Sequence, residues 1–138
     1  MTTAIDTNVL VALWNEDDTL NTLARSALDA AQRRGSLVVA APVYAELLAF
    51  PSRDESFLDS FFRETGISID WNLDESVWRA AGKAFGVYAR KRERGPGPRR
   101  ILADFLIGAH AQEGGFRLLT LDEGVYRAAF PRIVLLRV

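Results

Sequence analysis

Cysteine is absent from this chain of 138 residues, and its absence removes three kinds of chemistry at once. The protein can form no disulfide, no metal site with thiolate ligands and no cysteine nucleophile. A chain without thiols fits a reducing compartment, so we expect a cytoplasmic protein. His110 is the only histidine, and a pair of histidines therefore cannot act as general acid and general base.

Long apolar runs are also missing. No uninterrupted apolar stretch approaches the roughly 18 residues of a membrane span. The first six residues contain neither the basic nor the apolar part of a secretion signal. We therefore expect a soluble protein with no membrane contact. A chain of this length can bury a full core, which predicts one domain over residues 1–138.

The formal net charge is only −1, but the charge is distributed unevenly. Residues 90–100, here called the basic strip, hold six basic side chains against one acid, which is +5 locally and leaves −6 for the remainder. A basic strip on an otherwise acidic domain predicts an anionic partner. The alternative is a solvated loop without a partner. The arginines of the strip are Arg90, Arg92, Arg94, Arg99 and Arg100.

Short apolar stretches alternate with longer segments of helical periodicity along the chain. Strands are predicted over residues 3–5, 37–40, 67–71, 118–120 and 133–136, and helices between them. Because each parallel step needs a crossover, this alternation predicts an α/β protein, a sandwich of helices on both faces of a central parallel sheet.

Several local signals predict where individual helices begin and which side they bury. Asp17 and Asp18 can cap the second helix, and Ser52 with Glu55 has the spacing of a capping box. Pro42 is a helix-start signal for a helix whose apolar run is predicted over residues 43–50. Four aromatic side chains are at core spacing and are expected to pack inside: Trp71, Trp78, Phe85 and Tyr88.

One carboxylate lies where carboxylates are rare. Residues 101–111 are almost entirely apolar and must be buried if they form a helix, yet Asp104 lies near their start. An ionised side chain in apolar surroundings is costly unless it is paired, hydrogen-bonded or bound to a metal. Asp104 can be the N-cap of the helix, or it can face other acids around a cation.

Three further acids follow predicted strands. Asp6 comes directly after the first strand, Glu46 about one helical turn after the second, and Asp122 just after the fourth. Ligands of open parallel sheets bind beyond the carboxyl ends of the strands, so all four acids can meet at one edge. Carboxylate oxygens suit Mg²⁺ or Mn²⁺, whereas zinc prefers histidine or cysteine.

Four short motifs surround these acids. They are Ile5-Asp6-Thr7-Asn8-Val9-Leu10, Ala45-Glu46-Leu47, Ala103-Asp104-Phe105-Leu106-Ile107-Gly108-Ala109-His110-Ala111 and Leu119-Thr120-Leu121-Asp122. In this order they resemble the motifs of PIN-domain nucleases, and they look most like those of the VapC toxins of bacterial VapBC toxin–antitoxin pairs. The resemblance runs from end to end of the chain. The loop before Asp104 departs from it, being longer and richer in glycine, proline and arginine.

The resemblance implies a PIN-like α/β/α sandwich and a Mg²⁺- or Mn²⁺-dependent endoribonuclease. Carried over by position, four carboxylates would form a catalytic, metal-binding tetrad, with Asn8 and Thr120 as supporting polar residues. Metal ions held in this way activate a water and neutralise charge on the phosphodiester, which leaves a 5′-phosphate and a 3′-hydroxyl. The basic strip would then bind RNA. The tetrad residues are Asp6, Glu46, Asp104 and Asp122.

The resemblance also implies a cognate VapB-like antitoxin as a partner, and we expect a homodimer. Relatives offer the antitoxin an apolar groove between early helices, and this chain has surplus apolar residues in that region. They are Leu13, Trp14, Phe57, Phe61 and Phe62.

Two other functions compete with this interpretation. A phosphotransfer domain also collects aspartates at a sheet edge but needs a lysine there, and both lysines, Lys83 and Lys91, fall on the long helix. The second is a catalytically silent PIN-like module that binds RNA or protein. An intact tetrad argues against it, because clustered carboxylates without a metal are destabilising. His110 lies off the Asp104 face of its helix and is expected to be a core or surface residue.

Overall fold

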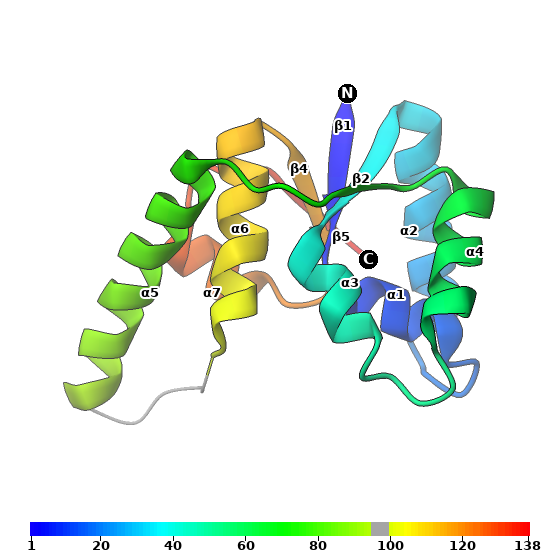
Figure 1. The fold of residues 1–138 in the computed structure, drawn as a ribbon, viewed down its shortest axis with the longest axis horizontal. Coiled ribbons are helices and arrows are strands. Elements are labelled where there is room, and N and C mark those ends of the chain that lie inside the picture. The colour runs from blue at the N-terminus through cyan, green and yellow to red at the C-terminus, as the bar shows by residue number, and fades with distance from the viewer. Residues whose placement is uncertain (95–99) are drawn as a thin grey trace.

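Five parallel strands form the centre of the part of the chain that the structure describes (Figure 1). The computed structural model describes the backbone of residues 1–94 and 100–138 and the side chains of residues 1–92 and 100–138. The strand order is β3-β2-β1-β4-β5, and every neighbouring pair is parallel. The strands are β1 (Thr2–Ile5), β2 (Ser36–Ala40), β3 (Ser68–Asp70), β4 (Arg117–Thr120) and β5 (Leu135–Arg137).

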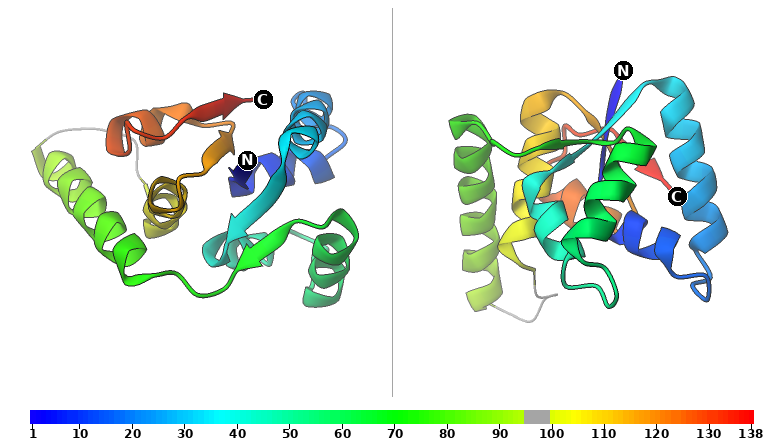
Figure 2. Two further views of the ribbon diagram at one scale, coloured as in Figure 1. Left: turned by 90° about the horizontal axis from the view of Figure 1, so that it is seen from above. Right: turned by 45° about the vertical axis from the view of Figure 1, so that its right-hand side comes forward.

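Helices lie on both sides of this sheet, as the view from above in Figure 2 shows. This confirms the predicted α/β class and the parallel central sheet. The helices are α1 (Thr7–Trp14), α2 (Asn21–Arg34), α3 (Ala41–Leu47), α4 (Glu55–Thr65), α5 (Glu75–Arg94), α6 (Leu102–Gly114) and α7 (Glu123–Ala129). None of the described helices is both long and apolar enough to cross a membrane.

The strand order places the first strand at the centre of the sheet. In the register, Ile5 at the end of β1 lies opposite Leu119 of β4, and Ala40 at the end of β2 lies opposite Asp70 of β3. The carboxyl ends of β1, β2 and β4 therefore lie side by side. The segments that leave these strands, α1, α3 and the turn into α7, all begin at this edge.

Helix α6 is the buried helix that its composition predicts. All residues from Phe105 to Ala111 are buried, and Gly108 lies so close to Phe130 that an added Cβ would be 2.4 Å from the ring. The expectation that the whole stretch is buried is wrong at its start. Ile101 and Leu102 are exposed, because the first turn of α6 extends past the end of the sheet.

Two helix starts differ from the sequence prediction. The capping box at Ser52 does not form, because Ser52 takes a positive φ of 66° and the chain turns once more before α4 begins. Asp54 is the N-cap instead, and its side chain accepts a hydrogen bond from the Phe57 N–H at 2.8 Å. Helix α2 begins later than predicted, since Asp18 accepts the Leu20 N–H at 2.7 Å within a turn before the helix.

The C-terminal ends of α3 and α5 also differ from the sequence prediction. Helix α3 stops at Leu47 because the Ala49 and Phe50 N–H groups bond three residues back, to Glu46 and Leu47, in tight turns. Helix α5 continues to Arg94, two residues beyond the range of about residues 75–92 that the sequence predicts. The last strand starts at Leu135, later than predicted.

The predicted burial of the two tryptophans near α5 is wrong. Trp71 and Trp78 are 58% and 53% exposed. Figure 2 shows α5 on the outside of α6, and a helix that packs mainly against one other helix buries only a narrow stripe. Val77 lies on that stripe and is 5% exposed, so Trp78, next along the helix, faces away. Phe85 packs as predicted, with its ring centroid 5.2 Å from that of Phe105.

Candidate active site

Asp6 lies at the centre of the acidic edge, which is the carboxyl edge of the sheet with its four acids, Asp6, Glu46, Asp104 and Asp122. Its backbone N–H donates to the carbonyl of Leu119 at 3.0 Å, which continues the pairing of β1 with β4 by one residue. Its side chain is only 5% exposed. Oδ2 accepts hydrogen bonds from the hydroxyls of Thr120 and Tyr126, both at 2.8 Å. The carboxylate is therefore buried and held in one orientation from two sides.

Burial dominates the ionisation of Asp6. Loss of solvation raises its pKa from 3.8 to about 6, although the hydrogen bonds from Thr120 and Tyr126 lower it and the nearby Asp104 charge raises it further. Burial of Tyr126, together with the Asp6 charge, raises the pKa of its hydroxyl, so this hydroxyl stays protonated and donates a hydrogen bond. Asp6 thus carries a charge at neutral pH that the fold only partly compensates.

Glu46 reaches the same edge from α3. Its Oε1 accepts a hydrogen bond from the Thr7 hydroxyl at 2.6 Å, and Thr7 directly follows Asp6 in the chain. Partial burial raises the pKa of Glu46, the Thr7 hydrogen bond lowers it, and the Asp104 charge raises it. Sequence reasoning did not assign a role to Thr7.

Asp104 lies in the first turn of α6, but it is not the N-cap that one interpretation of the sequence proposed. Ile101 holds that position, and its N–H donates to Asp104 Oδ2 at 3.4 Å. Burial raises the pKa of Asp104, the Ile101 hydrogen bond and the Arg100 charge lower it, and the Asp122 charge raises it. Asp104 therefore interacts electrostatically with each of the other three acids.

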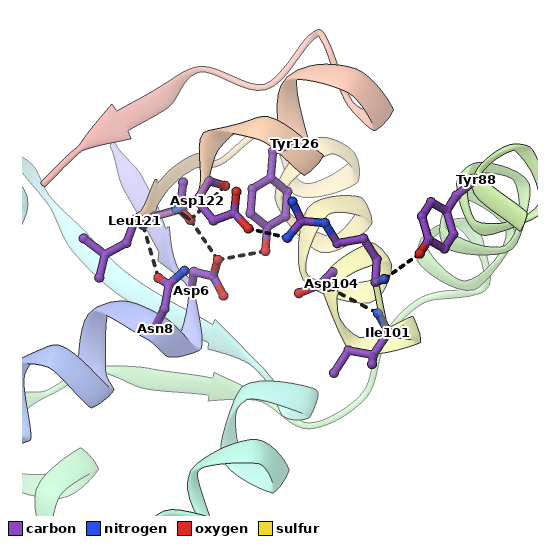
Figure 3. A network of polar contacts seen from close by, with 10 residues as sticks. Asp6, Asn8, Tyr88, Ile101, Asp104, Leu121, Asp122 and Tyr126 are labelled. Carbon is purple, nitrogen blue, oxygen red and sulfur yellow. Dashed lines mark hydrogen bonds and ion pairs between the residues drawn. The ribbon is translucent and has the colours of Figure 1, made fainter. Parts of the chain in front are cut away.

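Asp122 is the N-cap residue of α7 and forms an ion pair with Arg100 through Oδ2 and Nη1. The turn that presents it is held by the two polar residues expected to support the site. Thr120 Oγ1 accepts the Asp122 N–H at 2.9 Å, and Asn8 Oδ1 accepts the Leu121 N–H at 3.2 Å. Figure 3 shows Asp6, Asp104 and Asp122 turned toward one space beside the Tyr126 hydroxyl.

Tyr126 is, like Thr7, a residue at this edge to which the sequence did not assign a role. Its side chain is fully buried at 0% exposure, and its position on the short amphipathic helix α7 indicated only a core residue. The one available signal was its place one helical turn after Asp122, which puts its hydroxyl near the carboxyl end of β4.

The donor chemistry of this edge fits a hard divalent cation. All four acids supply oxygen, and burial and mutual repulsion raise the pKa of three of them, which a cation would reverse. Among the described residues, however, no three acidic or histidine side chains are already close enough to share one ion. The carboxylates are ligands of the type that Mg²⁺ or Mn²⁺ prefers, but Asp122 already forms an ion pair with Arg100.

The described arginines of the basic strip lie in two different places, on α5 and beside the acids. Arg90, Arg92 and Arg94 belong to α5, where Arg90 and Arg92 are exposed. Arg99 and the side chain of Arg94 lie outside the described residues. Arg100 points to the acids, with a side chain only 22% exposed. RNA binding by the strip stays a prediction.

The predicted antitoxin residues form an aromatic cluster between α1 and α4. The Trp14 ring lies edge-on to Phe57 and Phe61, with centroid distances of 5.3 and 5.0 Å. The Arg53 guanidinium lies 4.4 Å from the Phe57 ring centroid. Leu13 also packs against the core, and Phe62 is 6% exposed beneath the cluster. Their role in binding stays a prediction.

His110 is a core residue, which is one of the two possibilities that the sequence left open. It is 4% exposed, and its Nε2 lies 2.7 Å from Asp70 Oδ2 at the end of β3. Its ring tilts against Phe116 at a centroid distance of 5.2 Å. It is not part of the acidic edge.

Comparison with known protein families decides the classification of this fold. The model of the PIN domain matches residues 3–131. This chain belongs to the PIN domain family. The match spans nearly the whole protein and runs from β1 to the end of α7.

Solved structures of the same fold come from several bacteria. The PIN domain superposes on a chain of VapBC2 from Rickettsia felis, bound to a DNA fragment from its promoter, with a TM-score of 0.72 and 20% identity over 99% of this chain and 98% of that one. For VapBC-1 from nontypeable Haemophilus influenzae, the TM-score is 0.68 and the identity 19%, with the same coverage. For FitAcB from Neisseria gonorrhoeae, the values are 0.64 and 20%, over 96% and 95% of the chains. No curated protein gave a significant match.

Proposed function

We propose that this PIN domain is a Mg²⁺- or Mn²⁺-dependent endoribonuclease and the toxin of a VapBC-type toxin–antitoxin pair. The observation that carries the proposal is the acidic edge, where Asp104 interacts electrostatically with Glu46, Asp122 and the buried Asp6. Four acids gathered at one edge without a cation are unfavourable, and a bound divalent ion would offset that cost. The likeness to chains of VapBC complexes supports the toxin assignment.

The residues of the site have separable tasks. Asp6, Glu46, Asp104 and Asp122 would hold the metal. When bound, a divalent ion supplies Lewis-acid chemistry, lowering the pKa of a water and neutralising charge on the phosphate. Thr120 and Tyr126 fix the Asp6 carboxylate by donating to the same oxygen, and Thr7 fixes Glu46. Asn8 holds the turn that carries Asp122.

The alternative function is a silent PIN module that binds RNA or protein without cleaving it. One observation favours it: Arg100 already neutralises Asp122 without a metal. Cleavage of a single-stranded RNA by the purified protein separates the two functions. We expect activity with Mg²⁺ or Mn²⁺, loss of activity in EDTA, and at least about a 100-fold loss in Asp104→Asn, a change of about 2.7 kcal/mol in transition-state stabilisation.

The control for Asp104→Asn is Asp17→Asn, which removes an exposed acid that is not one of the four tetrad residues. Both variants should retain the wild-type circular dichroism spectrum. Full activity of Asp104→Asn with Mg²⁺ would refute the assignment of the tetrad.

The partner would be an antitoxin whose amphipathic segment covers the aromatic cluster between α1 and α4. Large aromatic side chains at the centre of an interface contribute most of its binding energy. Trp14→Ala should therefore abolish co-purification of the protein encoded beside this toxin, while Trp78→Ala, which removes an exposed tryptophan elsewhere, should not. Retention of the partner by Trp14→Ala would contradict this assignment. Light scattering of the free protein tests the expected homodimer.

A further inference from the structure

Arg100 is a basic residue built into the acidic edge. Its side chain is 22% exposed, and Nη1 forms an ion pair with Asp122 Oδ2. Its charge also lowers the pKa of Asp104, so the guanidinium acts on two of the four acids. The other arginine ion pairs between described residues join Arg79 to Glu75 and two arginines to Glu123, and neither of these acids belongs to the tetrad. Arg100 thus supplies positive charge where the site carries its negative charge.

The position of Arg100 is fixed by its backbone. Its N–H donates to the Tyr88 hydroxyl at 2.6 Å, a contact drawn in Figure 3 between α5 and the start of α6. The Tyr88 ring packs on Phe85 and Phe105, with centroid distances of 6.2 and 5.5 Å. These rings are part of the contact between α5 and α6. Packed aromatic residues therefore hold the backbone of Arg100 at the position from which its side chain reaches Asp122.

A guanidinium and a divalent cation cannot both use Asp122 fully. They would compete for the same carboxylate, and two cations on neighbouring oxygens repel each other. Among the described residues no three acids are grouped closely enough to share an ion, and Asp122 is paired with Arg100. Once released, a guanidinium at the edge of the site is well suited to a phosphate, because its planar donors match phosphate oxygens.

We propose that Arg100 is the counter-cation of the metal-free site, competes with the divalent ion for Asp122, and pairs with the substrate phosphate after the ion displaces it. The inference rests on the proposed metal-dependent function. It gives one residue two successive roles, and it predicts that removing Arg100 strengthens metal binding while it weakens RNA binding. A purely RNA-binding arginine would change only the second property.

Calorimetric titration of the full chain with Mn²⁺ tests the competition. Arg100→Gln should bind Mn²⁺ about fivefold more tightly than the wild type, a change of about 1 kcal/mol. Arg100→Lys, which keeps the charge, should stay near the wild-type affinity. Arg25→Gln is the matched control, because Arg25 is exposed on α2 and forms no ion pair with another described residue. Asp122→Asn should weaken Mn²⁺ binding.

A second arm measures thermal unfolding in EDTA and RNA binding with Ca²⁺. In EDTA, Arg100→Gln should lower Tm, and adding Asp122→Asn should recover it, since the uncompensated carboxylate is then gone. With Ca²⁺ in place of the activating ions, Arg100→Gln should bind a single-stranded RNA several-fold more weakly.

The outcomes separate the two proposals. Unchanged or weaker Mn²⁺ binding in Arg100→Gln, with normal binding by the wild type, would overturn the role of Arg100 alone. No Mn²⁺ binding by any variant would overturn the metal-dependent function and the competition together. An unaltered Tm of Arg100→Gln in EDTA would refute the counter-cation role whatever the metal data show.

Discussion

Replacement of Asp6 by asparagine is expected to stabilise the metal-free protein. Burial raises the pKa of Asp6 from 3.8 to about 6, so keeping it ionised at pH 7.5 costs about 3 kcal/mol relative to the unfolded chain. Asparagine removes that charge and can still accept from Thr120 and Tyr126 through its amide oxygen, although more weakly. We expect a net gain of about 1–2 kcal/mol in the free energy of unfolding.

The pH dependence gives the sign of this effect. Because the folded-state pKa lies above the unfolded value of 3.8, the folded protein binds the proton more tightly. The contribution of Asp6 to stability therefore rises as the pH falls through about 6, and it levels off below 3.8. The advantage of Asp6→Asn over the wild type should accordingly be largest at pH 7.5 and shrink toward pH 4.5.

Urea unfolding in EDTA at both pH values measures these differences, with Asp17→Asn as the control for loss of one exposed acid. Saturating Mg²⁺ should reverse the order, since binding of the ion stabilises only the wild type, by about 2.7 kcal/mol at 100 times the Kd. A wild type that is more stable than Asp6→Asn in EDTA at pH 7.5 would refute the reasoning about burial.

Two further predictions concern the core and the basic strip. Gly108→Ala should destabilise the protein by about 1–3 kcal/mol in urea unfolding, because its Cβ would lie 2.4 Å from the Phe130 ring. Gly82→Ala on α5, where nothing lies within 4 Å, should instead stabilise it by roughly 0.5 kcal/mol, and equal effects would contradict the packing argument. If α5 contacts RNA phosphates, the double variant Arg90→Ala/Arg92→Ala should flatten the plot of log affinity against log salt by about 1.4 without changing the cleavage site. An unchanged slope would show that these arginines do not contact RNA.

The sequence by itself determined the order of elements and the residues of the acidic edge. Asp6 directly follows a short apolar strand and Asp122 lies two residues after another, which places both acids at carboxyl ends. Parallel strands bring those ends together wherever their helices go. The burial of α6 was equally clear, because a segment as apolar as residues 105–111 has no exposed side to offer. These inferences needed only periodicity and the geometry of a parallel sheet.

Some helix starts and the exposure of some side chains could not be predicted from the sequence, because contacts with neighbouring segments outweigh weak local sequence preferences. Ser52 and Asp54 are both good caps, and only the path of the turn between α3 and α4 selects Asp54. Trp78 has core spacing in the sequence, but α5 packs against one neighbouring helix and leaves it outside. Propensity and periodicity describe one element at a time, whereas these outcomes depend on what lies beside it.

Only the tertiary structure decided which groups touch the acids. The hydroxyl of Tyr126 reaches Asp6 across 120 positions of sequence, and Arg100 meets Asp122 across 22. A tyrosine on an amphipathic helix and an arginine in a basic strip have many ordinary explanations, so neither residue type identifies its partner. Sequence patterns constrain the direction of a side chain relative to its own helix or strand, while hydrogen bonds and ion pairs depend on distances between elements that only packing determines.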